Sequence, residues 1–337
     1  MDFKNVIAID AMGGDNAPGE IIKGAIDAIN ERADIKLRLF GDRDKIEAEL
    51  HKYTYNKEQI EVIHASEVIA TEEPPVNAVR KKKDSSLVVG MNMVRKGEAD
   101  AIVSAGSTGA ILVGGQVLVG RIKGVERPPL AVLIPTDKGV SLLLDGGANV
   151  DARPSHLVQF AKMGSIYMEN VMGIQNPRVA IVNIGAEEEK GNALVKETYP
   201  LLKNCPDIHF IGSVEARDIP AGAADVIVCE AFVGNVILKM YEGVGRSLIH
   251  KVKEGMMTSL RSKIGALLVK PALKETLKAF DLEQYGGAPL LGLKGLVVKT
   301  HGSSKAVEIK NSILQCITFS EQNINQKIKE KITMEEN

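Results

Sequence analysis

Residues 101–120 read AIVSAGSTGAILVGGQVLVG and contain no charged side chain over twenty positions. That length is sufficient for a membrane-spanning helix. The same stretch, however, contains five glycines and the polar residues Ser104, Ser107, Thr108 and Gln116, which are unfavourable in a bilayer. We therefore interpret it as a buried β-strand followed by a helix, the repeating unit of α/β proteins.

The same alternation of short β-rich runs and longer helical patterns continues in both directions along the chain. Helices are predicted at 18–31 and 154–170, and one long helix is predicted between the runs EVIHA and ADAIVSAG. This order indicates an α/β fold with a mostly parallel sheet. The other predicted strands are VIAID (6–10), LRLFG (37–41), EVIHA (61–65), AVLIP (131–135), VSLLLD (140–145), RVAIVNIG (178–185), IHFIG (208–212), DVIVCEA (225–231) and LVVKTHG (296–302).

Neither a repeat of fixed period nor a long Pro/Gly/Ser linker interrupts this pattern. A chain of this length can bury about 75% of its unfolded surface in a single body. We therefore expect one domain over residues 1–325, with a helical hairpin that protrudes around 245–285. Residues 326–337 are polar and charged, and we expect them to form a tail whose end frays.

The composition excludes some classes of protein. The chain has 42 Lys and Arg against 43 Asp and Glu, a net charge of −1, which argues against nucleic acid as a partner. With 45% hydrophobic and 25% charged residues, it has the composition of a soluble globular protein. The start MDFKNVIAID lacks the features of a signal peptide, and the three cysteines form no C-x-x-C pair. Both observations predict a protein of the reducing cytoplasm.

Six loops that follow predicted strands are rich in glycine, hydroxyl, amide or carboxylate groups. In an open parallel sheet, ligands bind beyond the carboxyl ends of the strands, where loops and helix N-termini converge. Glycine lets backbone N–H groups approach a ligand, and a helix start suits an anion such as phosphate. The alternative for each single loop is an ordinary turn or N-cap. The candidate binding residues are Asp10, Gly13, Gly14, Asp15, Ser104, Gly106, Ser107, Thr108, Gly109, Asp145, Asn149, Gly191, Asn192, Gly234, Gly302, Ser303 and Ser304.

The signature motifs of several enzyme classes are absent from the sequence. There is no P-loop, no G-x-G-x-x-G after the first strand, no G-x-S-x-G and no H-E-x-x-H, so the common nucleotide, hydrolase and zinc sites are disfavoured. The six histidines are scattered, and we expect neither a metal nor another cofactor. Cys229 lies in an apolar strand, which is typical of a packed small hydrophobe rather than of a nucleophile.

Lys190 is the most prominent charged candidate. It follows three glutamates and precedes Gly191 and Asn192, near the start of a predicted helix. A lysine there could hold phosphate as a point charge, or it could be a solvated side chain that balances its acidic neighbours. We interpret Asp145 as a loop-ordering carboxylate. The amide of Asn235, like that of Asn149, suits either a developing oxyanion or the closure of a turn.

Longer strings, in this order over about residues 3–325, carry a more specific resemblance: AIDAMGGD, SAGSTGA, LLLDGGANVDARPSHLVQFAKMGSIY, NIGAEEEKGN, VEARDIP, FVGNVILK and YGGAPLLGLKG followed by HGSS. They closely resemble the bacterial phosphate acyltransferase (PlsX) family. The resemblance implies transfer of a fatty acyl group from acyl carrier protein to inorganic phosphate. The acyl phosphate formed would serve the first acylation of glycerol 3-phosphate in phospholipid synthesis. A homodimer and a Rossmann-like three-layer α/β/α sandwich, similar to phosphotransacylases and to isocitrate and isopropylmalate dehydrogenases, are also implied.

The implied reaction agrees with the missing nucleophile motifs, because phosphate itself can attack the thioester carbonyl. The resemblance makes Lys190 and the Gly/Ser loops a phosphate cradle and Asn235 a group that polarises the carbonyl. His301 is the candidate that protonates the leaving thiolate, with a structural or solvated role as the alternative. The chain departs from the common family pattern at Ser107, Ser213, Glu230-Ala231 and Val233, which leaves the role of position 230 open.

A basic segment suggests a membrane contact. Residues 251–278 contain seven Lys or Arg against two acids, and Pro271 interrupts a helical pattern of apolar side chains. A basic amphipathic tip suits an anionic membrane, and a buried dimer interface is an alternative that does not exclude it. We therefore expect peripheral membrane association, close to the downstream glycerol-3-phosphate acyltransferase. The candidate membrane contacts are Leu260, Ile264, Leu267, Leu268 and Val269.

Residues 80–83, of sequence RKKK, lie on a predicted helix and either steer an acidic carrier protein or form a solvated face. Three rival functions remain open on the sequence alone. They are a phosphotransacylase that uses short acyl-CoA, a dehydrogenase on the similar fold, and a non-catalytic scaffold for carrier protein or membrane.

Overall fold

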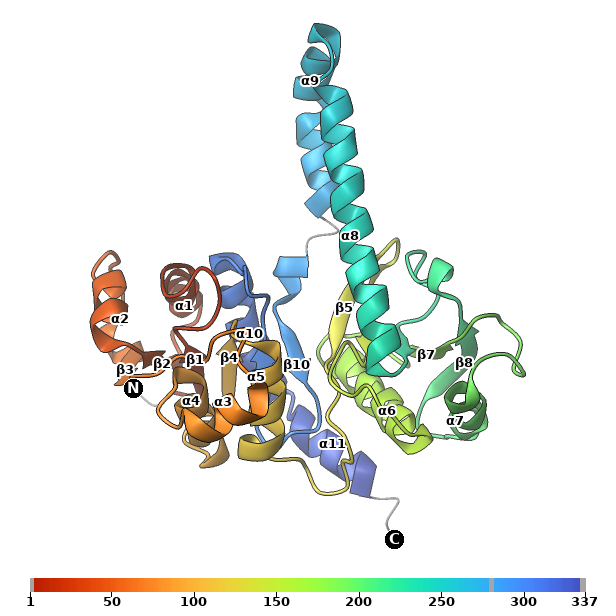
Figure 1. Cartoon of the computed structure of the whole chain (residues 1–337), viewed down its shortest axis with the longest axis horizontal. Helices are drawn as coiled ribbons and strands as arrows, with labels where there is room; N and C mark the ends of the chain where they lie inside the picture. Colours follow the sequence, from red (N-terminus) through yellow and green to blue (C-terminus); the bar gives the residue numbers. More distant parts are fainter. Residues whose placement is uncertain (1–2, 279–281, 334–337) are drawn as a thin grey trace. The chain divides into compact units, whose positions relative to one another are not determined.

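The computed structural model describes residues 3–278 and 282–333 (Figure 1). The chain divides into two compact units. The first comprises the described residues of Met1–Val132, Lys162–Asn176 and Glu283–Asn337, and the second comprises those of Leu133–Ala161 and Pro177–Leu282. Helix α6, Pro154–Asn170, begins in the second unit and ends in the first.

The first unit contains a six-stranded sheet of order β10-β11-β4-β1-β2-β3. Among its described strands, β10 pairs antiparallel with β11 and the others are parallel. The central strands are hydrophobic on both faces, as expected of a parallel sheet covered by helices; Ile7, Leu37 and Ile102 are fully buried. The strands are β1 Asn5–Asp10, β2 Ile35–Gly41, β3 Ile60–His64, β4 Ala101–Ser104, β10 Ala288–Leu290 and β11 Leu296–Lys299.

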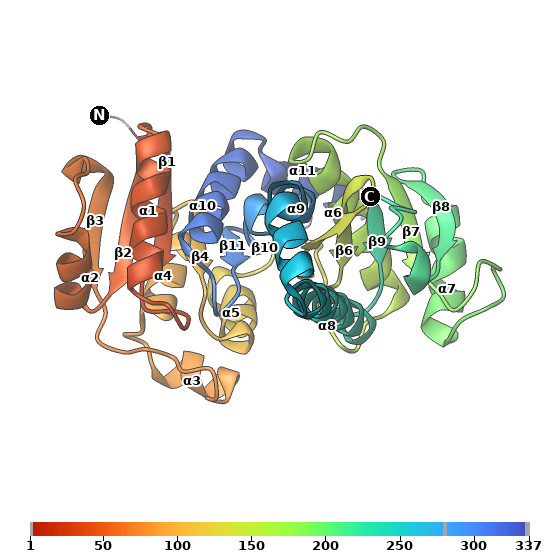
Figure 2. The same cartoon turned by 90° about the horizontal axis from the view of Figure 1, so that it is seen from above.

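Helices cover this sheet and are positioned by small residues. α1 (Gly19–Glu31) packs on α10 (Ala306–Glu321), and the two lie side by side in Figure 2. A Cβ on Gly24 would lie 2.6 Å from the Ala306 oxygen and from Ile309 Cβ, so a glycine is required where the helices cross. The other helices are α2 Arg43–Leu50, α3 Pro75–Lys81, α4 Ser86–Arg95, α5 Thr108–Gly114 with a π turn over Gly115–Val119, and α11 Ile324–Thr333.

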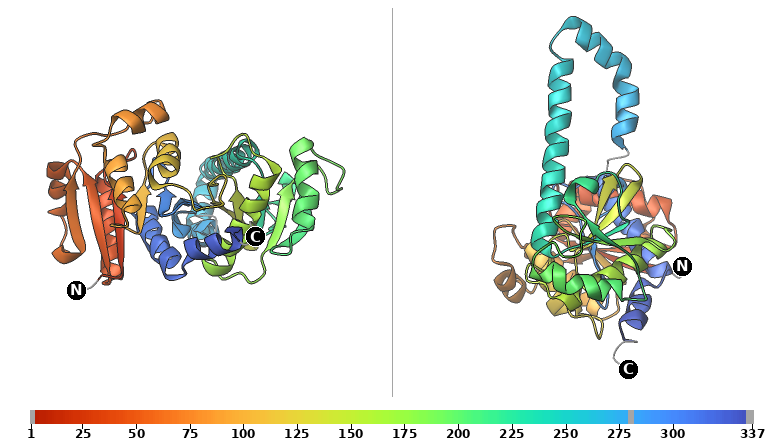
Figure 3. Two further views of the ribbon diagram at one scale, coloured as in Figure 1. Left: turned by 90° about the horizontal axis from the view of Figure 1, so that it is seen from below. Right: turned by 90° about the vertical axis from the view of Figure 1, so that its right-hand side faces the viewer.

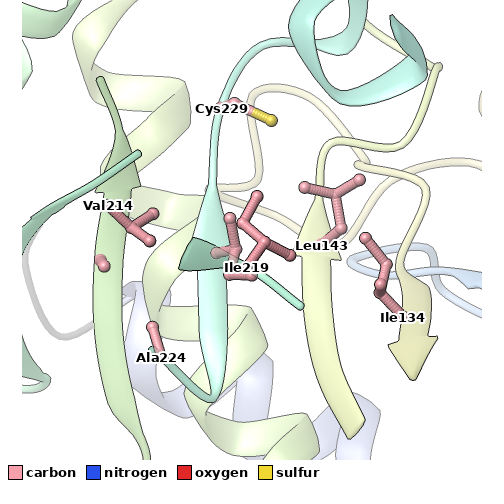
Figure 4. Packing of buried hydrophobic residues seen from close by; sticks show 8 residues of the cluster. Ile134, Leu143, Val214, Ile219, Ala224 and Cys229 are labelled. Carbon is pink, nitrogen blue, oxygen red and sulfur yellow. The ribbon is translucent and has the colours of Figure 1, made fainter. Parts of the chain in front are cut away.

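The second unit contains a five-stranded sheet of order β5-β6-β9-β7-β8, in which β6, β9, β7 and β8 are parallel. Its core contains the buried side chains of Ile134, Leu143, Ile219, Ile227 and Cys229 (Figure 4). The elements are β5 Val132–Thr136, β6 Gly139–Leu144, β7 Arg178–Val182, α7 Ala193–Lys203, β8 His209–Val214, β9 Val226–Val228, α8 Ala231–Met256 and α9 Leu260–Lys278.

Helix α8 has two different halves. Its first half packs on the core through Val233, Ile237 and Tyr241, and the Tyr241 hydroxyl donates to the Pro135 oxygen over 2.6 Å. Its second half continues beyond the sheet of its own unit, and α9 returns beside it as a hairpin (Figure 3). Residues 279–281 of the hairpin expected at 245–285 lie outside the described residues. No described helix is long and apolar enough to cross a membrane.

The sequence predicted most of these elements, with three differences. The predicted strand and helix within 101–120 and the helix at 154–170 are confirmed. The single long helix predicted before β4 is wrong: the chain forms α3 and α4, because Ser85 starts a new helix by accepting from the Val88 N–H. The short strand β10 was not predicted.

The third difference concerns the expected charged tail at 326–337. Residues 324–333 form α11, since Ile324, Ile328 and Ile332 recur at four-residue spacing and are buried on one face. Residues 334–337 lie outside the described residues.

Candidate active site

In the first unit, three glycine-rich loops meet beyond the carboxyl ends of the adjacent strands β1, β4 and β11. The Asp15 N–H donates to the Gly302 oxygen over 2.7 Å, which joins the first loop to the third. Gly14 has φ +94° and a Cβ there would lie 2.8 Å from both Ala105 Cβ and the Gly302 oxygen. Only glycine fits this point, so the three loops depend on it.

Asp10 organises these loops from below. Its carboxylate is buried and accepts from the Ser104 hydroxyl over 2.6 Å, and the same hydroxyl oxygen accepts from the Gly106 N–H over 3.1 Å. Burial raises the pKa of Asp10, against the opposing effect of its hydrogen bonds. A Cβ on Gly13 would lie 2.6 Å from the Asp10 carboxylate. Asp10 and Ser104 therefore order the loop, rather than face solvent.

The loop after β4 leads directly into α5. Ser107 is the N-cap of α5, and its oxygen accepts from the Ile111 N–H while its side chain makes no capping hydrogen bond. Thr108, the first helical residue, is exposed. Gly109 packs against Pro75, where a Cβ would lie 2.4 Å from the ring. Thr108 is thus the member of this loop that presents its side chain to solvent.

The HGSS loop is held by Glu308, a residue that the sequence pattern did not single out. The Glu308 carboxylate accepts from the His301 N–H over 3.1 Å and from the Ser304 hydroxyl over 2.6 Å. The Ser303 N–H donates to Nδ1 of His301 over 3.3 Å, so Nδ1 acts as an acceptor and Nε2 is the ring nitrogen left to donate. Glu308 stands at the third position of α10, where a capping glutamate is common, and that pattern could have revealed it.

In the second unit, Asp145 orders the loop after β6. One carboxylate oxygen accepts from the Gly147 and Ala148 N–H groups, and the other accepts from the N–H and the side-chain amide of Asn149, at 2.7 to 3.0 Å. These bonds agree with the interpretation of Asp145 as a structural carboxylate. Asn149 is part of the same loop structure and is buried.

The start of α8 packs directly on this loop. A Cβ on Gly234 would lie 1.9 Å from the Asp145 oxygen, and the Ala231 N–H donates to the Asn149 oxygen over 3.1 Å. Asn235 follows on the exposed side, and its Oδ1 would be 3.7 Å from a Cβ on Gly147. The sequence left the role of position 230 open. In the structure, Glu230 caps α8 by accepting from the backbone N–H groups of residues 232 and 233.

Lys190 lies in the loop between β7 and α7, two residues before the Asn192 cap of that helix. Its Nζ is 2.8 Å from the Glu187 carboxylate, and the side chains of both are about half exposed. The hydrogen bond to Glu187 raises the pKa of Lys190. A Cβ on Gly185 would lie 2.6 Å from Lys190 Cδ and 2.8 Å from the Glu187 carboxylate, so the pair lies over the bare backbone of Gly185.

The backbone of the Lys190 loop is tied to the sheet. The Asn183 amide donates to the Lys190 oxygen over 3.2 Å and to the Ser213 hydroxyl over 3.1 Å. Gly191 has φ +106° and a Cβ there would lie 2.6 Å from the Asn183 side chain. Asn183 and Ser213 thus support a residue whose ammonium group remains accessible.

The structure gathers the candidate residues into two clusters, one in each unit. The first unit holds those of the Asp10–Asp15, Ser104–Gly109 and His301–Ser304 loops; the second holds Asp145, Asn149, Lys190, Gly191, Asn192, Gly234 and Asn235. Cys229 is buried, and burial raises the pKa of its thiol well above the usual value. No cluster of three metal-ligating side chains occurs among residues 3–278 and 282–333.

Two further regions singled out in the sequence belong to other segments of the chain. All five candidate membrane contacts are exposed on α9, from 46% for Val269 to 76% for Leu260. In the basic run, Lys82 donates to Glu73 over 2.6 Å and to the Val68 oxygen over 2.7 Å. Only part of that run therefore remains a solvated basic surface.

Comparison with known proteins identifies the family. The family model described as "Fatty acid synthesis protein" matches residues 5–327. The chain belongs to this family. Among the members, "Phosphate acyltransferase" of Alkaliphilus oremlandii is 52% identical over 97% of this chain and 97% of its own length, and "Phosphate acyltransferase" of Clostridium acetobutylicum is 50% identical over 97% and 98%. The family predicted from the sequence strings is confirmed.

Solved structures confirm the fold. A phosphotransacetylase from Streptococcus pyogenes has a TM-score of 0.64 at 16% identity and covers 95% of this chain and 96% of its own. EutD phosphotransacetylase from Staphylococcus aureus has a TM-score of 0.59 at 18% identity, over 95% and 94%. This chain thus shares a mostly parallel, Rossmann-like α/β fold with these proteins.

Proposed function

We propose that the protein is a phosphate acyltransferase that moves a fatty acyl group from acyl carrier protein to inorganic phosphate. The observation that carries this proposal is the 50% identity to phosphate acyltransferases over nearly the whole of both chains. The acyl phosphate formed is an activated acyl donor, and we assign it to the first acylation of glycerol 3-phosphate in phospholipid synthesis.

The proposed reaction is a direct displacement. An oxygen of hydrogen phosphate attacks the thioester carbonyl carbon, a C–O bond forms, and the C–S bond breaks. The proton of the hydrogen phosphate ends on the departing thiolate, so the products are acyl phosphate and the free carrier thiol. No covalent enzyme intermediate is required, and the protein contributes orientation and charge stabilisation.

In the second unit, Lys190 is the proposed partner of the phosphate. Its side chain is half exposed, and the hydrogen bond to Glu187 raises its pKa further above neutrality, so the ammonium group is positively charged. An ammonium group has three donors, so it can bind phosphate while it retains Glu187. The Asn235 amide, beside the ordered Asp145 loop, is the proposed donor to the carbonyl oxygen as charge develops there.

In the first unit, the joined loops after β1, β4 and β11 are proposed to bind substrate through their backbone N–H groups. The contact of Gly14 with Ala105 and Gly302 supports this, because it brings the loop backbones together without side chains between them. Nδ1 of His301 accepts from the Ser303 N–H, so Nε2 is the ring nitrogen that can donate. We propose that the proton reaches the thiolate through Nε2.

The α8–α9 hairpin is proposed to serve two partners. The second half of α8 exposes Val244, Leu248, Ile249 and Val252, an apolar stripe that a second copy of the chain would cover. The exposed leucines of α9 lie within the basic segment 251–278 and suit an anionic membrane surface. We therefore propose a homodimer of the cytoplasm with peripheral membrane association near the downstream acyltransferase.

A product assay tests the reaction directly. Palmitoyl carrier protein is incubated with the enzyme, with and without phosphate, and both free carrier and acyl phosphate are measured. We expect acyl phosphate only when phosphate is present. Acetyl-CoA and butyryl-CoA serve as competing donors, and faster turnover of these would indicate a short-chain phosphotransacylase. Carrier binding without turnover would indicate a scaffold.

A further inference from the structure

Three large hydrophobic side chains are exposed beyond the carboxyl ends of adjacent strands in the second unit. Leu144 of β6, Val228 of β9 and Ile181 of β7 lie in one row of the sheet. The loops that follow this row carry Val150, Phe232 and Ile184, which are 61%, 65% and 79% exposed. Because parallel strands end at one edge of a sheet, these side chains share that edge.

The backbone around each of these side chains is fixed. The hydrogen bond from the Ala231 N–H to the Asn149 oxygen joins the two chain segments in which Val150 and Phe232 are the next residues. The Phe232 N–H donates to the Glu230 carboxylate, and the Ile184 N–H donates to the Asn183 side chain over 2.8 Å. These side chains thus remain outside the core on ordered backbone, rather than on an unstructured loop.

The same loops carry the polar candidates. Val150 follows Asn149, Phe232 precedes Asn235 by three residues in the first turn of α8, and Ile184 belongs to the loop of Lys190. If Asn235 holds the thioester carbonyl, the acyl chain must begin here and continue over neighbouring surface. Exposed apolar side chains close to polar binding groups are typical of a site for a ligand that has both a polar and an apolar part.

We infer that Val150, Ile184 and Phe232 form a binding surface for the hydrocarbon chain of a long acyl substrate. The inference rests on the proposed function and adds the location of the acyl chain. Val236, one turn after Phe232 on α8 and 51% exposed, continues the surface away from the strand ends. A short acyl group would reach only its beginning, so the surface favours long chains over short ones.

The expected effect follows from the chemistry of a methylene group. A methylene that leaves water completely strengthens binding about fourfold, and one that is covered on one side by an open surface contributes about twofold. A chain that crosses the Phe232 ring places roughly four methylenes on it, so removal of the ring should reduce the preference for the long chain about fifteenfold.

The test compares Phe232→Ala and Ile184→Ser with wild type and with Leu201→Ala, a control on α7 of the same unit whose side chain is 48% exposed. The ratio of kcat/KM for palmitoyl carrier protein to that for butyryl carrier protein is measured. We expect the ratio to fall about fifteenfold in Phe232→Ala, to fall less in Ile184→Ser, and to stay at the wild-type value in Leu201→Ala.

A binding measurement without phosphate separates this inference from the proposed function. Fluorescence of cis-parinaric acid reports binding of an 18-carbon chain whether or not acyl phosphate forms. Weaker binding in Phe232→Ala, with binding by Leu201→Ala unchanged, supports the surface. Equal binding and an unchanged ratio in both test variants would overturn it, although the proposed function would stand. Conversion of a wild-type dimer to a monomer by Phe232→Ala would also overturn it, because the side chain would then belong to a subunit interface.

Discussion

Replacing Gly234 by alanine should destabilise the second unit by about 1–3 kcal/mol or more, the usual range for an added methyl group in a well-packed site. The new Cβ would lie 1.9 Å from the Asp145 oxygen and 2.9 Å from its carbonyl carbon. Ordinary contacts begin at 3.4 Å, so the start of α8 or the Asp145 loop would have to move by about 1.5 Å. The loop is held by four hydrogen bonds to Asp145, which resist the movement.

Gly243 on the same helix provides the matched control. A Cβ at Gly243 has no neighbour within 4 Å, so Gly243→Ala should be neutral or should stabilise by about 0.5–1 kcal/mol through helix propensity. Thermal unfolding by circular dichroism compares the two. We expect Gly234→Ala to lower Tm by roughly 3–10 °C and Gly243→Ala to leave Tm unchanged or slightly raised. Equal Tm values for the two variants would refute the steric reasoning.

The remaining predictions concern charge, reactivity and membrane binding. Lys190→Ala should reduce phosphate-dependent turnover at least tenfold, by loss of one charged contact, with Tm unchanged. Leu268→Glu should release the protein from anionic vesicles in a sedimentation assay while soluble activity is retained. Of the three cysteines, only Cys205 should react with iodoacetamide before unfolding, because the other two are buried and their thiol pKa values are raised. Asp225→Asn should lower Tm at pH 6. Burial raises the pKa of Asp225, but the hydrogen bonds from Arg178 outweigh it and hold the pKa below its ordinary value of 3.8, so the difference from wild type should begin to shrink below pH 3.8 and vanish only below the folded-state pKa.

Each of these predictions has a control or an opposing outcome. Lys203 forms the same 2.8 Å ion pair, with Glu188, so Lys203→Ala should keep full turnover; equal losses in both lysine variants would remove Lys190 from the phosphate site. Unchanged vesicle binding by Leu268→Glu would end the membrane proposal for α9. Rapid labelling of two or three thiols in the folded protein would contradict the burial of Cys229 and Cys316. A Tm difference for Asp225→Asn that does not begin to shrink as the pH falls below 3.8 would show that its charge is not the cause.

The sequence predicted those parts of the fold that local patterns determine. Hydrophobic runs located most strands, and the helix at 154–170 has the predicted bounds, because both depend on side chains close in sequence. The antiparallel strand β10 was missed because it has three residues and its identity depends on pairing with β11. The split into α3 and α4 depends on the cap at Ser85, which a count of helix-forming residues does not detect.

The sequence located the candidate residues, but it did not determine the role of each one. Glycine and small polar residues at strand ends located the loops, but their chemistry depends on contacts between distant segments. The sequence left open whether Asp10 binds a ligand or orders its loop, and its hydrogen bond with Ser104 joins residues that are 94 positions apart in the chain. The ion pair of Lys190 with Glu187 was visible as an alternative, whereas the requirement for Gly185 beneath it is a matter of space that only coordinates reveal.

The surroundings of Cys229 favour the proposed direct attack by phosphate over a cysteine nucleophile. The thiol lies at the end of β9, near the carboxylates of Asp145 and Glu230. Burial first, and then these two negative charges, raise the pKa of the thiol, so a thiolate would be formed against both effects. Hydrogen phosphate arrives already ionised and needs only a positive group to hold it, which Lys190 can supply. A site that suppresses its own cysteine nucleophile and keeps an accessible lysine is therefore better suited to orient phosphate than to form an acyl-enzyme.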